Sequence, residues 1–198
     1  GLLNTALAGT DPVIFLESQQ LYGKGERFHA EGVPVDYYEI PIGDPDVKRA
    51  GKDLTIITFG PSLFKALDAA DVLAAKHGLE AEVIDLRSIN PLDYAKLVES
   101  IKKTGKVVLV NEAVERGNVM HNIAANLTQL CFDYLDAPPV VIGARNWVSP
   151  AAELESKYFP QVSWILDSIH ERIMPLAGYT PETNRTLGEL SRTSRLGV

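Results

Sequence analysis

The chain has 198 residues, 45% of them apolar, which is enough for one domain of ordinary size with a real core. Its net charge is −7, and no basic cluster is present, which excludes a general nucleic-acid binder. Cys131 is the only cysteine, which excludes an intrachain disulfide and disfavours a thiolate zinc site. The apolar runs are too short to span a bilayer and no signal peptide is evident. We therefore expect a cytoplasmic protein without a membrane partner.

The first 50 residues are interrupted by glycine and proline, which break any long helix or strand. Within residues 1–50 we predict a linker and a leading arm with one strand. The apolar run Val13-Ile14-Phe15-Leu16 is the candidate for that strand, and an extended crossing is expected near 36–41.

Residues 51–175 alternate short aliphatic runs with helical patterns. The runs predict strands covered on both faces, and the longer segments carry apolar residues at helical spacing. Strands are expected at 54–59, 82–86, 107–110 and 140–142; helices at 62–77, 93–103 and 118–132, and after Pro160. Ser62 is a candidate cap for the first of these helices, and Gly78 for its end. This alternation predicts an α/β fold: three α/β/α layers around a mostly parallel sheet of about five strands.

Residues 176–198 form a predicted polar C-terminal tail. The stretch from Thr180 to Val198 is rich in threonine, serine and arginine, so we expect it to be poorly ordered. Leu187 and Leu190 are the residues that could dock a short helical turn.

No self-contained active site is evident. The sequence contains neither a G-x-G-x-x-G nor a P-loop, and no G-x-S-x-G nucleophile elbow. His29, His77, His121 and His170 are scattered without ligand spacing, and Cys131 falls on the apolar face of a predicted helix, where a buried core residue is expected. We therefore predict no catalytic, cofactor-binding or metal-binding residues in this chain.

Two loops are the candidate interaction site. Both follow predicted parallel strands, so both should emerge at the carboxyl edge of the sheet, where ligands and partners of α/β proteins collect. The candidate interface residues are Glu112, Glu115 and Arg116 in the first loop, and Arg145, Asn146 and Trp147 in the second. The alternative for the first loop is a solvated turn with Asn118 as a helix cap.

Tryptophans and one charged pair leave further alternatives open. Trp147 and Trp164 are either interface anchors or ordinary half-buried core residues, and Trp164 lies off the apolar stripe of its predicted helix. Asp85 and Arg87 end a strand and could form a buried pair, for which a structural ion pair is the favoured interpretation.

Several phrases together resemble one family. Glu82 to Asp93 (EVIDLRSINPLD) looks like the E-V-I-D-L-R-T-I-x-P-x-D signature of thiamine-dependent 2-oxoacid dehydrogenases, in particular of the beta chain of their decarboxylating component. Asp11 to Glu17, Tyr38 to Gly43, Lys103 to Lys106 and Phe132 to Pro138 resemble further segments of that chain in the same order. The resemblance covers roughly residues 2–175 and points to its carboxyl-terminal, transketolase-C-like domain.

The resemblance implies a parent protein that oxidatively decarboxylates pyruvate or a branched-chain 2-oxoacid and passes the acyl group to lipoyl-lysine. Thiamine diphosphate and magnesium would be bound by an amino-terminal half and by an alpha chain, so this chain alone should be inactive. Its implied role is assembly. The implied partners are a second beta chain in a homodimer contact, an alpha chain or fused alpha region, and the lipoyl acyltransferase core.

Two departures from the family pattern bear on those partners. Gly117 stands where the family has a glycine pair, and Asn146 replaces the family's acidic residue. The alternatives are a transketolase or 1-deoxyxylulose-phosphate synthase relative and a stand-alone protein-interaction domain. The absent initiating methionine and linker-like start are typical of a piece of a longer chain, which disfavours the last.

Overall fold

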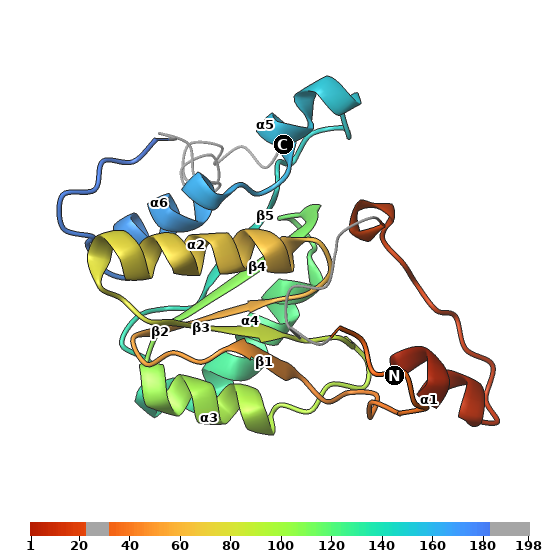
Figure 1. The fold of residues 1–198 in the computed structure, drawn as a ribbon. Coiled ribbons are helices and arrows are strands. Elements are labelled where there is room, and N and C mark those ends of the chain that lie inside the picture. Colours follow the sequence, from red (N-terminus) through yellow and green to blue (C-terminus); the bar gives the residue numbers. More distant parts are fainter. Residues whose placement is uncertain (23–31, 183–198) are drawn as a thin grey trace.

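The computed structural model describes residues 1–22 and 32–182, which build a five-stranded sheet between two layers of helices (Figure 1). The strand order is β1-β3-β2-β4-β5, with β1 antiparallel to β3 and the other neighbours parallel. The strands are β1 (Asp46–Arg49), β2 (Leu54–Thr58), β3 (Ala81–Asp85), β4 (Val107–Val114) and β5 (Val140–Ala144). The predicted α/β class with a mostly parallel sheet is confirmed.

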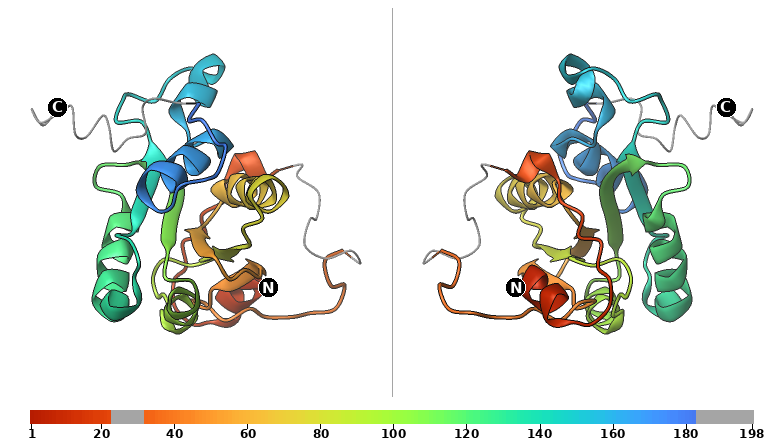
Figure 2. Two further views of the ribbon diagram at one scale, coloured as in Figure 1. Left: turned by 90° about the vertical axis from the view of Figure 1, so that its left-hand side faces the viewer. Right: turned by 90° about the vertical axis from the view of Figure 1, so that its right-hand side faces the viewer.

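Helices cover both faces of this sheet. The helices of the described residues are α1 (Leu2–Ala8), α2 (Ser62–His77), α3 (Ala95–Thr104), α4 (Val119–Cys131), α5 (Glu155–Tyr158) and α6 (Val162–Arg172), with short 3₁₀ turns η1 (Gln19–Leu21), η2 (Phe132–Tyr134) and η3 (Ala152–Leu154). Side views show α2 and α6 together on one face and α3 and α4 on the other (Figure 2). None of the helices in the described part of the chain has the length and apolarity needed to cross a membrane.

The core lies on both faces of the sheet because successive strand residues point to opposite sides. Ile56 and Val108 pack with α2 and α6, whereas Ile57 and Leu109, which are partners in the β2–β4 register, pack with α3 and α4. Cys131 is buried in the second cluster, as its place on the apolar face of the helix predicted.

The ends of α2 show one correct and one wrong prediction. Gly78 ends the helix in the left-handed conformation, with φ of 65°, and its N–H donates to the Ala74 carbonyl at 3.2 Å. Ser62 does not cap the other end. Pro61 occupies the cap position because the helix already includes Ser62, and the Ser62 hydroxyl is buried without a hydrogen-bond partner.

The predicted strand at 13–16 is wrong. These residues belong to no strand, and their apolar side chains are exposed on an arm that passes outside the layers (Figure 1). High β-propensity is not sufficient for a strand, which also requires a neighbouring backbone to pair with. The strand within residues 1–50 is β1, a short polar segment whose pairing with β3 extends the sheet into the region assigned to the arm.

The chain beyond α6 still contacts the body of the domain. Leu176 is buried against the α2/α6 face, and Tyr179 packs against the same cluster. The hydrophobic core therefore includes residues on the tail side of position 175. The predictions for residues 183–198, Leu187 and Leu190 among them, lie outside the described residues, and the domain boundaries stay predictions.

Candidate interaction site

The two candidate loops lie side by side at the carboxyl edge of the sheet. The N–H of Arg116 donates to Asn146 Oδ1 at 3.0 Å, which joins the loop after β4 to the loop after β5. Strand β4 is longer than predicted and continues to Val114, opposite Ala144 of β5. This edge also lies where the chain leaves β2 and β4 towards opposite sides of the sheet, the place where α/β proteins commonly bind ligands.

The backbones of the two loops approach very closely. Glu115 N–H donates to the Ala144 carbonyl at 3.1 Å, and Gly143 faces the β4 strand so tightly that a Cβ there would lie 2.6 Å from the Ala113 carbonyl oxygen. A glycine is therefore required at position 143 for close approach. These contacts fix the relative position of the two loops.

A pair of asparagines organises the first loop from within. The side chains of Asn111 and Asn118 are buried and exchange two hydrogen bonds, of 3.0 and 2.5 Å. Asn118 Oδ1 also accepts from the Met120 N–H at 2.8 Å, which confirms the predicted cap of α4. The loop is thus anchored to β4 at one end and to α4 at the other.

Glu115 places a carboxyl group inside the loop rather than on its surface. The residue is 8% exposed, and Oε2 is buried without a hydrogen-bond partner. Burial raises the pKa of Glu115 to about 7, although Arg172, Arg145 and Arg116 favour the charged form. At neutral pH this carboxyl therefore lies close to its own titration point.

Arg145 and Trp164 form a buried stack beneath the second loop. The guanidinium of Arg145 lies 3.9 Å from the centroid of the Trp164 ring, a favourable cation–π geometry. The Arg145 N–H donates to the Tyr158 carbonyl at 3.0 Å. Trp164 is buried, so the prediction that it lies off the apolar stripe of its helix was wrong. Trp164 is therefore a core residue and not an interface anchor, and the Arg145 guanidinium covers its ring.

The exposed part of the site is small and partly apolar. Trp147 is 57% exposed and Val148 92%, and Arg116 and Asn146 are also exposed. Glu112 is half-buried, and burial, followed by the nearby Glu155, raises its pKa. Of the six candidate residues, Glu115 and Arg145 are too buried to contact a partner directly and would support the loops from below. An interface role for the set stays a prediction.

The predicted pair at the end of β3 takes a different form. The Arg87 guanidinium bonds to Asp46 of β1, and Asp85 Oδ1 accepts the Arg87 backbone N–H at 3.0 Å. An ion pair is present, but its acid is Asp46. The sequence did not indicate this partner because β1 was not predicted.

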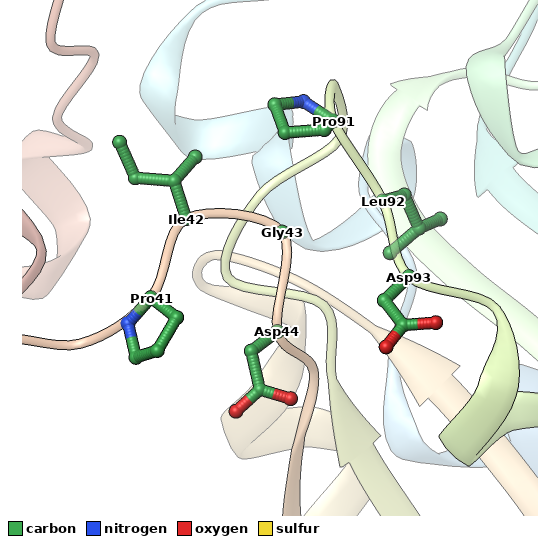
Figure 3. A pocket seen from close by; sticks show the side chains of 7 residues that line it. All are labelled: Pro41, Ile42, Gly43, Asp44, Pro91, Leu92 and Asp93. Atoms are coloured by element: carbon green, nitrogen blue, oxygen red, sulfur yellow. The ribbon is translucent and has the colours of Figure 1, made fainter.

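A pocket of about 460 Å³ lies elsewhere, between residues 41–44 and the loop 91–93 (Figure 3). Its two carboxylates are already engaged. Asp44 pairs with Lys96 at 2.5 Å, and Asp93 Oδ1 accepts the Ala95 N–H at 2.8 Å. The Gly43 carbonyl accepts the Asp93 N–H at 2.8 Å across the pocket, so these groups join residues 41–44 to the loop 91–93 and the start of α3.

The described residues, 1–22 and 32–182, contain no group of three or more histidine, cysteine, aspartate or glutamate side chains that could hold a metal ion.

Comparison with known proteins finds one matching family model and relatives that are beta subunits of 2-oxoacid dehydrogenases. Residues 43–165 match the family model described as transketolase, C-terminal domain. The chain is 40% identical over 170 residues to the pyruvate dehydrogenase E1 component subunit beta of Rhizobium meliloti (strain 1021), covering 85% of this chain and 36% of the relative. It is 43% identical over 162 residues to the 2-oxoisovalerate dehydrogenase subunit beta of Bacillus subtilis (strain 168), covering 80% and 47%.

A solved structure shares the fold. The structure named "Split gene transketolase, inactive beta4 tetramer" matches with a TM-score of 0.58 and 28% identity, over 72% of this chain and 47% of that one. The chain thus spans about half or less of the length of the relatives it matches.

Proposed function

This chain belongs to the transketolase C-terminal domain family, and from that premise we propose that it is the carboxyl-terminal domain of a dehydrogenase beta subunit. The parent complex would oxidatively decarboxylate a 2-oxoacid. Relatives at about 40% identity are named as beta subunits of pyruvate and of 2-oxoisovalerate dehydrogenases. These names support the class of 2-oxoacid dehydrogenases and do not distinguish between the two substrates. A cytoplasmic location of the complex is part of the proposal.

The chemistry belongs to the rest of the complex. Thiamine diphosphate with magnesium would supply the decarboxylation, and the acyl group would pass to lipoyl-lysine. The chain spans about half or less of its relatives' length, and the resemblance assigns the cofactor site to an amino-terminal half and an alpha chain, so the isolated chain is proposed to be inactive. Calorimetric titration with thiamine diphosphate and magnesium should show no heat above dilution. Micromolar binding would contradict this assignment.

The proposed role of the chain itself is assembly. It would contact a second beta chain and an alpha chain or region, and the edge loops would dock the lipoyl acyltransferase core. The observation that carries this proposal is Trp147, a large exposed aromatic on a loop held by the bond between Asn146 and Arg116. An aromatic side chain on a rigid support loses little conformational freedom on binding, which is typical of interface anchors.

Trp147→Ala tests this role directly. The substitution should weaken binding to the isolated docking domain of a lipoyl acyltransferase by about 1–3 kcal/mol, measured by calorimetry. The matched control is Phe132→Ala, which removes an aromatic ring of greater exposure from η2, outside the loops. Equal effects of the two substitutions, or none from Trp147→Ala, would contradict docking through this loop.

The charge of the second loop gives an independent test. Asn146 is neutral and its Oδ1 accepts the Arg116 N–H, so docking should depend weakly on salt. Asn146→Asp keeps an acceptor at this position and adds a negative charge. It should make docking to a basic partner surface steeper in ionic strength. An unchanged salt slope would show that position 146 lies outside the contact.

A transketolase relative is the second candidate, favoured by the split-gene transketolase structure. In the first candidate the whole protein would pass an acyl group to a lipoyl domain. In the second it would pass a glycolyl group to an aldose phosphate. Assay of the complex containing this chain with a lipoyl domain and with an aldose phosphate separates them.

A further inference from the structure

The segment after α6 folds back over the end of the α2/α6 layer, and we name residues 173–182 the C-terminal clasp (Figure 1). Leu176 of the clasp is 3% exposed and packs in the core cluster of α2 and α6. The Tyr179 hydroxyl donates to Asp167 Oδ1 at 2.6 Å, and the Glu182 N–H donates to the same oxygen at 3.1 Å. The clasp is therefore tied to α6 at several points.

His170 makes one of these ties in a form that depends on its protonation. Its Nδ1 accepts a hydrogen bond from the Leu176 N–H at 2.9 Å. A neutral imidazole has one acceptor nitrogen, whereas a protonated imidazole has two donors and no acceptor. Protonation of His170 therefore removes the partner of a backbone N–H that belongs to a buried residue, which is unfavourable.

His77 imposes the same requirement from the other helix. It is the last residue of α2, and both of its ring nitrogens are buried without a hydrogen-bond partner. The Tyr179 ring contacts both histidines, with centroid distances of 5.9 Å to His77 and 5.5 Å to His170. A charged imidazolium in the position of His77 would have no acceptor for its protons.

The charged groups around the clasp are of both signs. Asp167 and Glu171 of α6 and Glu182 of the clasp surround Tyr179 and, with burial as the first cause, raise its pKa well above the usual range, so the hydroxyl stays a donor. Lys76 and Arg172 are the basic residues in the last turns of the two helices. The acidic groups favour an imidazolium nearby, but the closed geometry offers it no acceptor at His77 and costs a bond at His170.

We propose that the C-terminal clasp is a pH-sensitive latch: it is closed by the neutral imidazoles of His77 and His170, and their protonation releases it. Histidine is the side chain whose charge changes between pH 7 and 5. Release uncovers Leu176 and Tyr179 at the end of α2 where His77 lies. This end is opposite to the interaction loops, so the proposal does not depend on the proposed docking.

Amide hydrogen exchange measured by NMR tests the latch. Between pH 7.5 and 5.0 the protection factor of the Leu176 amide, corrected for the intrinsic rate, should fall by about tenfold or more. The amide of Ile56 in β2 should keep its protection, which separates clasp release from global unfolding. Unchanged protection of Leu176 would overturn the proposal.

His170→Asn supplies an acceptor oxygen that does not titrate. Leu176 in this variant should lose less protection between pH 7.5 and 5.0 than in the wild type, because only His77 then changes its charge, whereas His121→Asn, on an exposed histidine of α4, should behave like the wild type. A pH-dependent loss in His170→Asn equal to that of the wild type would overturn the proposal. If asparagine does not restore protection at pH 7.5, the imidazole ¹⁵N titration of wild-type His170 decides. Proton uptake without loss of Leu176 protection refutes the latch.

Discussion

Glu115 should destabilise the fold progressively as pH rises from about 4.5 to about 7. Its carboxyl has a folded-state pKa of about 7 against an ordinary 4.5, so the folded state binds more protons than the unfolded state between these values. Stability therefore falls as pH rises through this window. The gap corresponds to a loss of about 3 kcal/mol once both states are ionised. Glu115→Gln, a neutral substitute of the same shape, should remove this loss.

Urea unfolding at pH 5 and pH 8 measures the effect. Glu115→Gln should match the wild type within about 1 kcal/mol at pH 5 and exceed its stability by about 2–3 kcal/mol at pH 8. The matched control is Glu99→Gln, an exposed glutamate of α3, which should change stability by less than about 0.5 kcal/mol at either pH. A variant less stable than the wild type at pH 8 would refute this reasoning, because it would show that the arginines hold Glu115 as a net favourable anion.

Other predictions concern the loop anchor and the core. Asn118→Ala removes a helix cap and leaves Asn111 buried without its partner, so unfolding free energy should drop by about 2–4 kcal/mol in urea, whereas Asn118→Ser, which keeps the cap, should lose less. Leu127→Ala should cost about 2–5 kcal/mol because this side chain is fully buried, and a loss below about 0.5 kcal/mol would contradict the packing of α4. The Cys131 thiol, whose pKa burial raises, should react slowly with a thiol reagent in native protein and fast in denaturant. Fast native labelling would place it at the surface.

The regular elements of the domain were predictable because each carries its own pattern. Helix α2 has an apolar stripe and a glycine at its end, and strand β2 is aliphatic throughout because both of its faces are buried. Strand β1 was missed because it is short, polar and placed at the edge of the sheet, where only pairing with β3 identifies it. The reverse error at residues 13–16 has the same cause, since pairing is a property of two segments.

The candidate site was predictable in position but not in detail. Parallel strands brought the loops with Glu112 and Trp147 to one edge, as the topology requires. The burial of Glu115 and Arg145 could not be anticipated, because charged residues are rarely buried unless something compensates them. For Arg145 that compensation comes from Trp164, which lies 19 positions further along the chain and whose orientation depends on how α6 packs. Sequence spacing alone does not carry this information.

Native mass spectrometry of the complex that contains this chain in its source organism is the most direct test of the assembly role. We expect beta chains in pairs, joined to alpha chains or regions, with thiamine diphosphate bound, and a lipoyl acyltransferase that dissociates when Trp147 is replaced by alanine. A beta subunit that remains monomeric, or an acyltransferase complex unaffected by that substitution, would contradict it.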